Sequence, residues 1–454
     1  MRTIGNEVNG SRLHRPAGQP HRSGISGCRP CGCTCCCAAS LASGCLPRAQ
    51  LLAATRIAAT MLDAPLATPG GFPDGAGRGR PVMIGGMGTS ADAGDAPLAP
   101  GNTPSLPEPT GPCPVGTTSL YLTDTSRPDP WAAGVTAREL MVSLWYPATP
   151  SDGRRAQYMT PAESGLQLTS RGITGVPQDA LSTTRTNAVS DAAPPGLQCA
   201  LPLVVLSPGF TNSRSTLTAL AEDLASHGYI AAGIDHTYES FATTFPDGRV
   251  TTCLAREAPR SGRGEKVVAG RAADVSFVLS ELTGAHPAWP GAGLIDPSRM
   301  AMAGHSIGGA AAIPAMRADS RIRAGIDMDG ATHAQIPDDG LSRPFLFLGK
   351  QSPGTPGKRG GTASTWERDW KLLTGWKRWL LVAGAIHASF TDFALLADKI
   401  GIDTGAGIPG ARSLDITRAY VRAFLDQHLR SRPQVLLDQP SPRYPEVTFC
   451  SPGG

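Results

Sequence analysis

The segment "MAMAGHSIGGAAAIPAM", residues 300–316, changes character at its centre. A small apolar run leads into Gly304-His305-Ser306-Ile307-Gly308, and an alanine-rich run follows. A buried strand that turns sharply into a helix has this pattern, because the two glycines remove side chains that would collide in the turn. The turn exposes the Ser306 hydroxyl at the helix start and predicts a nucleophile there. An ordinary joint of small residues is the alternative in a chain with 54 glycines.

A nucleophilic serine needs an imidazole to remove its proton and a carboxylate to orient that imidazole. In this architecture the acid and then the histidine follow the serine along the chain. His387 ends the last apolar run, in "VAGAIHASFTDF", and is the predicted base. His333 follows the acidic segment too closely, and His428 falls inside the closing helical pattern. We interpret His305 as a packing or orienting residue.

The acid is expected at the end of the strand after Ser306, where "GIDMDGATH" offers two aspartates. Asp329 is preferred because it stands further past the strand end and precedes a glycine, and Asp327 remains the alternative. The oxyanion formed on attack needs two backbone N–H donors. Ile307 supplies one, and Phe210 of "LSPGFTNS" is expected to supply the other.

Alternating apolar runs and amphipathic segments predict the fold. The runs are mostly continuous, as in strands buried on both faces, and the alternation predicts an α/β fold with a mostly parallel central sheet and helices on both faces. The expected strands are 139–147, 201–208, 229–236, 300–306, 322–330, 343–350 and 378–387, and the expected helices are 216–226, 269–282, 308–316, 365–373 and 416–429. Ligands bind outside the carboxyl ends of such strands, where the candidate residues fall.

Composition divides the chain into four regions. Residues 1–80 are expected to be a disordered leader, or a segment upstream of the true start, with Met61 and Met83 as alternative starts. Residues 81–113 are Gly/Pro-rich and are expected to be a linker. The catalytic domain is expected at 114–432, and a C-terminal tail at 433–454.

Charge and cysteine are concentrated in the leader. Nine arginines there account for more than the net charge of +4, so the remainder is close to neutral and lacks the basic stripe of a nucleic-acid binder.

The crowded cysteines between Cys28 and Cys45 lack a second pair at zinc-site spacing, so we expect no metal site and no cofactor. Pairing among Cys113, Cys199, Cys253 and Cys450 is left open. No apolar run is long enough to predict a membrane span.

Several segments together resemble one known family. They are "LASHGYIAAGIDHTYESFATTFPDG", "IDPSRMAMAGHSIGGAAA", "GIDMDG" and "GAIHASFTDF", in this order. Residues 116–429 are similar to the plasma-type (group VII) platelet-activating-factor acetylhydrolases and their bacterial relatives. The resemblance implies an α/β-hydrolase fold and calcium-independent hydrolysis of short acyl esters or phospholipids. It also implies Ser306, Asp329 and His387 as the triad, with Phe210 and Ile307 as oxyanion donors.

The resemblance has two departures. "SPGF" stands where the family more often has Ser-His-Gly, and with "LASHG" it also resembles cutinases and polyester hydrolases. Residues 148–196 resemble the family's entrance region more than its membrane-docking helices. A serine ester hydrolase of the acetylhydrolase type is therefore predicted. A cutinase, polyesterase or short-chain lipase is the close alternative, and a non-catalytic binding protein of the same fold is a more distant one.

Location and assembly are less constrained by the sequence. The resemblance implies secretion, but the first residues show no clear signal peptide, and a cytoplasmic location is the alternative. The expected partner is a small ester or phospholipid substrate, without nucleic acid, and the oligomeric state is left open.

Overall fold

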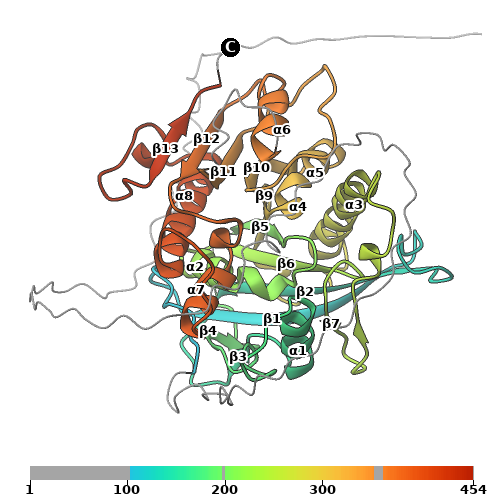
Figure 1. Ribbon diagram of the computed structural model, residues 1–454. Coiled ribbons are helices and arrows are strands. Elements are labelled where there is room, and N and C mark those ends of the chain that lie inside the picture. Colours follow the sequence, from blue (N-terminus) through green and yellow to red (C-terminus); the bar gives the residue numbers. More distant parts are fainter. Residues whose placement is uncertain (1–102, 197–199, 352–360, 453–454) are drawn as a thin grey trace, which may run out of the picture. The chain divides into compact units, whose positions relative to one another are not determined.

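The structure is a computed structural model that describes residues 103–196, 200–351 and 361–452 (Figure 1). Its described part contains an 11-stranded sheet in the order β13-β12-β11-β10-β9-β5-β6-β2-β1-β4-β3. The strands are β1 Val115–Asp124, β2 Arg138–Pro147, β3 Arg155–Gln157, β4 Arg185–Ser190, β5 Leu201–Ser207, β6 Ile230–His236, β9 Ile295–His305, β10 Ile322–Met328, β11 Phe345–Lys350, β12 Lys377–Val382 and β13 Val447–Cys450. A separate hairpin pairs β7 Thr243–Thr244 with β8 Val250–Thr251.

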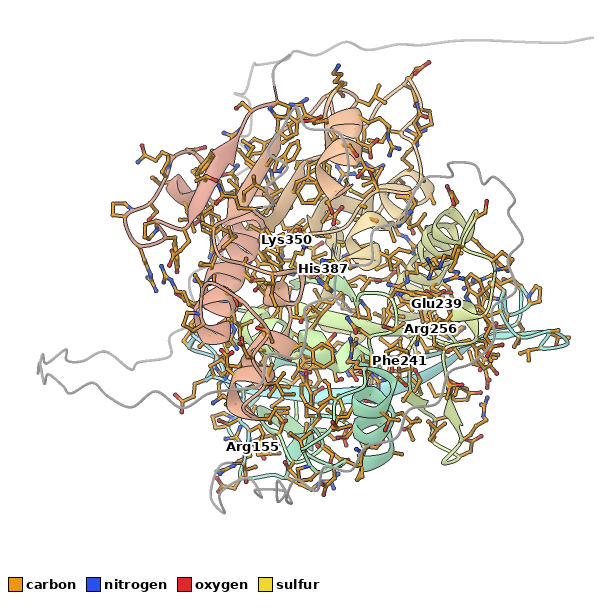
Figure 2. The ribbon with its side chains drawn as sticks, in the orientation of Figure 1. Arg155, Glu239, Phe241, Arg256, Lys350 and His387 are labelled. Carbon is orange, nitrogen blue, oxygen red and sulfur yellow. The ribbon has the colours of Figure 1, made fainter. Side chains whose placement is uncertain are left out.

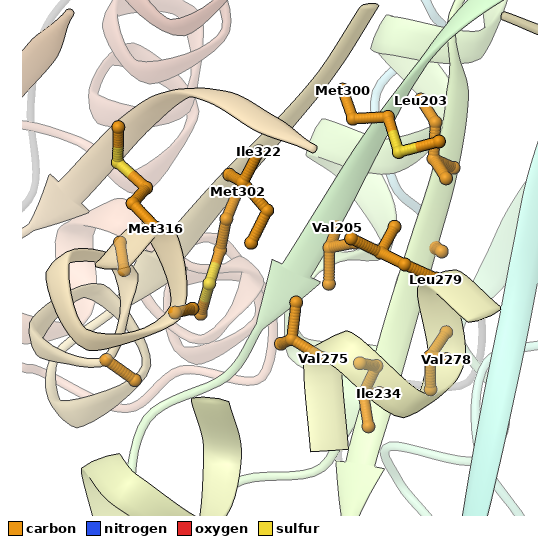
Figure 3. Close-up of a cluster of buried hydrophobic side chains, with 14 of the residues drawn as sticks. Leu203, Val205, Ile234, Val275, Val278, Leu279, Met300, Met302, Met316 and Ile322 are labelled. Atoms are coloured by element: carbon orange, nitrogen blue, oxygen red, sulfur yellow. The ribbon is translucent and has the colours of Figure 1, made fainter. Parts of the chain in front are cut away.

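Six neighbouring strands of the sheet are parallel to one another: β12, β11, β10, β9, β5 and β6. Alternate side chains of each strand enter opposite cores, which is why their sequences are almost continuously apolar. In β9, Met300 and Met302 face one core, whereas Ala301 and Ala303 face the other. Figure 3 shows Met300 and Met302 with Leu203 and neighbouring apolar side chains in the first core.

Helices cover both faces of this sheet. The helices are α1 Pro161–Ser170, α2 Thr218–Ser226, α3 Arg263–Thr283, α4 Ile307–Ala310, α5 Ala312–Ala318, α6 Gly361–Trp370, α7 Asp392–Lys399 and α8 Gly410–Arg430. α3 and α5 contribute to the core that holds Met300, and α2 and α8 contribute to the opposite core. Figure 1 shows these two pairs on opposite sides of the sheet. The predicted fold class is thus confirmed.

Several elements were not predicted from the sequence. β1 has an alternating buried and exposed pattern over part of its length, unlike the central strands. α1 begins at a capping box, in which Glu163 N–H donates to Thr160 Oγ1 and Thr160 N–H donates to the Glu163 carboxylate. The sequence pattern Thr-x-x-Glu is typical of a helix start and could have predicted α1. The strand expected to reach residue 387 ends at Val382, and a 3-10 turn, His387–Phe390, follows.

The expected domain ends differ from the structure. β13 lies in the segment expected to be a tail, pairs antiparallel with β12 and extends the sheet. Leu437 of the same segment is fully buried. Within the expected linker, Leu106 is buried and its N–H donates to the Arg185 carbonyl. Residues 433–454 are therefore not a detached tail where β13 and Leu437 pack on the domain. The apolar stretches there are short, and so the sequence did not indicate that they pack. Residues 1–102 lie outside the described residues.

Candidate active site

Ser306 lies between the end of β9 and the start of α4. Its backbone has φ 55° and ψ −129°, which a residue with a side chain adopts only when its surroundings enforce it. Its N–H donates to the Met328 carbonyl of β10 at 2.8 Å, fixing the turn against the neighbouring strand. The sequence-predicted strand-to-helix turn is therefore present at Ser306.

The two flanking glycines are required by close packing. A Cβ at Gly304 would collide with the backbone of Gly308. A Cβ at Gly308 would collide with the Ser207 carbonyl oxygen at the end of β5. The missing side chains thus let the start of α4 approach the loop that follows β5, which carries Phe210.

The structure brings His387 and Asp329 together. The Nδ1 of His387 lies 2.6 Å from Oδ2 of Asp329. The Asp329 side chain is 3% exposed, and its other oxygen accepts the Lys350 N–H at 3.1 Å. His387 is half-buried, and Figure 2 labels it near Lys350. The contact favours the tautomer in which Nδ1 donates to the carboxylate, and in that neutral imidazole Nε2 is the nitrogen that can act as a base.

Asp327 has different partners. Its Oδ1 accepts the Gly330 N–H at 2.8 Å, and its Oδ2 accepts the Trp366 indole N–H at 3.2 Å. The carboxyl is fully buried, and burial raises its pKa well above the usual range. The geometry brings Asp329, and not Asp327, to His387.

His305 packs beside His387, with ring centroids 4.5 Å apart. Its Nε2 lies 2.8 Å from the His387 carbonyl oxygen, so Nε2 carries the proton and Nδ1 does not. Burial, with a smaller contribution from His387, lowers the pKa of His305 well below its usual range. Its contacts are those expected of a neutral orienting group.

The two expected oxyanion donors both lie at chain turns. Phe210 is in the turn after β5, and Ile307 is the first residue of α4. Among the described residues, neither backbone N–H donates to a protein acceptor. Both donors are therefore available to a ligand, as an oxyanion site requires.

A buried network below the loop was not found from the sequence. Ser207 Oγ lies 2.9 Å from Nε2 of His236, whose Nδ1 lies 2.7 Å from Asp274. Arg271 donates to Ser207 Oγ and to the Pro208 carbonyl, and also pairs with Glu239 at 2.8 Å.

This network has the residue types of a catalytic triad but no access for a substrate. Ser207 and Asp274 are 0% exposed, and His236 is 2% exposed. We assign it to holding the end of β5, and thus the Phe210 turn, in place. The separation of Ser207 and Asp274 along the chain left no spacing signal in the sequence.

No cluster of three or more His, Cys, Asp or Glu suited to a metal ion occurs among residues 103–196, 200–351 and 361–452. The cysteines between Cys28 and Cys45 lie outside those ranges. Within the same ranges, no helix is both long and hydrophobic enough to cross a membrane.

Comparison with known proteins identifies the family. A family model described as platelet-activating factor acetylhydrolase, isoform II, matches residues 101–254 and 292–435. The chain belongs to this family. Its described fold is accordingly an α/β-hydrolase fold, and the chain is a carboxylic-ester hydrolase of the acetylhydrolase type.

Members of the family and a solved esterase are similar to this chain. The probable 1-alkyl-2-acetylglycerophosphocholine esterase of Arthroderma benhamiae is 30% identical over 383 residues, covering 76% of this chain and 93% of that protein. The platelet-activating factor acetylhydrolase of Cavia porcellus is 25% identical, over 50% of this chain and 57% of that protein. A ferulic acid esterase structure from Streptomyces cinnamoneus has 44% identity and a TM-score of 0.68, covering 77% of this chain and 100% of that one.

Proposed function

We propose that this esterase hydrolyses short-acyl esters through Ser306, His387 and Asp329. The observation that carries the proposal is the 2.6 Å contact between His387 and Asp329 at the same end of the sheet as the strained Ser306 turn. The unoccupied N–H groups of Phe210 and Ile307 complete the set of groups that acyl transfer needs.

In the first half-reaction, Nε2 of His387 takes the hydroxyl proton as Ser306 Oγ attacks the ester carbonyl carbon. Asp329 stabilises the resulting imidazolium through the Nδ1–H bond. The carbonyl oxygen becomes an oxyanion that accepts hydrogen bonds from Phe210 and Ile307 N–H. The bond to the leaving alcohol oxygen then breaks, and His387 protonates that oxygen.

In the second half-reaction, water replaces the alcohol. His387 removes a proton from the water as it attacks the acyl-enzyme carbonyl, and the same two N–H groups hold the second oxyanion. Collapse of this intermediate breaks the bond to Ser306 Oγ, returns the proton to the serine and releases the carboxylic acid.

For the acyl group, we propose acetyl to butyryl chains. Phe210, Tyr238 and Phe241 are bulky residues from the loops after β5 and β6, and we expect them to restrict the space for the acyl chain. Phe390, three residues after His387 in the chain, instead packs in the core with α8. Each excluded methylene is worth about 1–3 kcal/mol, so acetyl and butyryl esters should differ modestly and palmitoyl esters strongly.

The leaving group is proposed to include the lyso-phospholipid of a 2-acetyl phospholipid, in line with the names of the relatives. The test is kcat/KM for p-nitrophenyl esters from acetate to palmitate and for 2-acetyl and long-chain phospholipids, with and without chelator. We expect a maximum at acetyl to butyryl, cleavage of 2-acetyl phospholipid and no chelator effect. Faster cleavage of long-chain triacylglycerol or solid polyester would favour a lipase or cutinase instead.

Hydrolysis of hydroxycinnamate esters is a second candidate. It is favoured by the 44% identity to the Streptomyces cinnamoneus ferulic acid esterase over that protein's full length. Methyl ferulate and 2-acetyl phospholipid should be compared on the same preparation. A higher kcat/KM for methyl ferulate would replace the short-acyl proposal, whereas a higher value for the acetyl phospholipid would support it.

A further inference from the structure

Arg171 occupies an unusual position next to the candidate site. It caps the C-terminal end of α1, and its guanidinium carbon lies 4.4 Å from the Phe393 ring centroid and 5.4 Å from that of Phe241. The residue as a whole is half-buried. The cation thus lies beside two aromatic rings.

The guanidinium has no carboxylate partner among the described residues. Its hydrogen bonds go to neutral groups, the side-chain carbonyls of Asn212 and Gln167. Its Nε atom is buried and has no acceptor in the described part of the chain. Burial lowers the pKa of Arg171 to about 10, which still leaves it charged at neutral pH. A buried cation without a counter-ion is costly in a folded protein unless a ligand supplies the anion.

Two other arginines stacked on aromatic rings have their own carboxylates, and the two stacked arginines that have no ion pair among the described residues, Arg256 and Arg443, are exposed. Arg249 lies 4.3 Å from the Phe245 ring and pairs with Glu139 at 2.9 Å. Arg430 stacks on Tyr229 and pairs with Asp426 at 3.1 Å. Stacking alone therefore does not explain the missing partner of Arg171.

Contacts on both sides connect Arg171 to the candidate site. Its partner Asn212 follows the Phe210 turn and donates its N–H to the Gly209 carbonyl at 3.1 Å. Phe393 follows the turn that begins at His387. The charge of Arg171 also contributes to lowering the pKa of His305, after burial and His387. Arg171 therefore lies between the loop of the oxyanion donor and the segment that follows the base.

A second cation also lies beside Phe241. The guanidinium carbon of Arg256 is 5.6 Å from the Phe241 ring centroid, and the residue is exposed. Figure 2 labels Phe241 and Arg256 together with His387. No ion pair of Arg256 occurs among the described residues. The surroundings of Phe241 thus carry two unneutralised positive charges, one of them buried.

We propose that Arg171 binds an anionic group, phosphate or carboxylate, on the leaving alcohol of the ester substrate. The inference rests on the proposed function, because the leaving side is defined by His387, which protonates the departing oxygen. Arg171 stacks on Phe393 of the segment that follows His387 and so is placed on that side. Phe241 and Phe393 would contact the carbon skeleton that carries the anion, and Arg256 would add attraction from solvent.

The test compares four soluble esters: phenyl acetate, 3-acetoxybenzoate, 3-acetoxyphenyl phosphate, and monophenyl succinate, whose charge is on the acyl side. Each is measured with wild type, Arg171→Gln, Arg171→Lys and the matched control Arg249→Gln. Arg171→Gln should lower kcat/KM about tenfold or more for the two esters with an anionic alcohol, since a charge-assisted hydrogen bond is lost. Phenyl acetate and monophenyl succinate should change less than about twofold. Arg171→Lys should retain part of the preference, and Arg249→Gln all of it.

Equal losses on all four esters would show a purely structural role and overturn the proposal, as would no loss on any. A loss confined to monophenyl succinate would overturn the assignment to the leaving side. A binding readout separates this inference from the proposed function. Inorganic phosphate should raise the Tm of wild type and Arg249→Gln but not that of Arg171→Gln. If wild type fails to hydrolyse phenyl acetate yet shows this Tm shift, the function fails and the anion site stands.

Discussion

Asp327 and Asp329 are separated by one residue but have different environments. Asp327 is the penultimate residue of β10 and is held by Trp366 and Gly330. Asp329 follows the strand with a positive φ of 59°, which aims its carboxylate at His387. In a continuous strand the two side chains would share one face. The sequence left them as alternatives because a positive φ at an aspartate has no sequence signature.

We predict that Asp329→Asn lowers kcat/KM by about 10⁴, because His387 loses the group that fixes its tautomer. Asp327→Asn should cost activity far less, since Asp327 does not contact His387. Steady-state kinetics on p-nitrophenyl acetate with both purified variants measures the difference. The reverse ranking would transfer the role of the acid to Asp327.

The other candidate residues differ in how far the sequence could specify them. Ser306 and His387 follow from motif order, because a strand-turn-helix glycine pattern and a histidine after the last apolar run are both local signals. Arg171 and the Ser207–His236–Asp274 network were missed. Their partners lie on different elements, and a lone arginine or aspartate in sequence does not reveal whether it has a counter-ion.

At the scale of elements, the central strands were the easiest to predict. Their apolar runs match β5, β6 and β9 to β12 because both faces of each strand are buried. The half-exposed β1 and the short β3, β4 and β13 lack such runs. The expected helix over 308–316 is divided into α4 and α5 at Ala311.

α8 contains a histidine whose titration should destabilise the fold in acid. His428 packs against Trp376 and Phe424, with ring centroids 4.4 and 4.7 Å away. Burial lowers the pKa of His428 from 6.5 to about 4. As pH falls below about 6.5, His428 becomes protonated in the unfolded chain. In the folded chain it becomes protonated only near pH 4. Stability from this group is therefore present above pH 6.5 and is lost towards pH 4.

We predict that His428→Phe, which keeps an aromatic ring, removes this acid sensitivity. Between pH 7 and pH 4 the free energy of unfolding of wild type should fall by about 1–2 kcal/mol more than that of the variant, after allowance for partial exposure. Urea unfolding of both proteins at each pH gives the comparison, and other buried histidines cancel in the difference. Parallel pH profiles would contradict the assignment.

At the scale of the whole molecule, the two ends of the chain are expected to differ in importance. The C-terminal segment after α8 buries Leu437, Tyr444 and Val447 and supplies β13 at the edge of the sheet. Residues 1–80 are rich in Gly, Pro and Arg and were expected from composition not to pack on the domain.

We predict that deleting residues 433–454 destabilises the fold by about 5 kcal/mol or more, because three apolar side chains lose their burial. It also leaves β12 as an unprotected edge, which favours aggregation. Deleting residues 1–80 should leave activity and Tm nearly unchanged. Calorimetry and p-nitrophenyl acetate kinetics on both truncations check the contrast. A large fall in Tm on removing residues 1–80 would show that the leader supports the domain.

The central claim is that Ser306 is the nucleophile of this esterase. Intact-mass and peptide mass spectrometry after reaction with a fluorophosphonate tests it most directly, because the reagent forms a stable adduct only with an activated serine. We predict one adduct per chain, on the peptide that contains Ser306, with activity lost in proportion. Ser306→Ala should remain unlabelled and lose about 10⁶ in turnover. Labelling at another serine would contradict the account. So would a Ser306→Ala variant that retains more than about 1% of the wild-type activity.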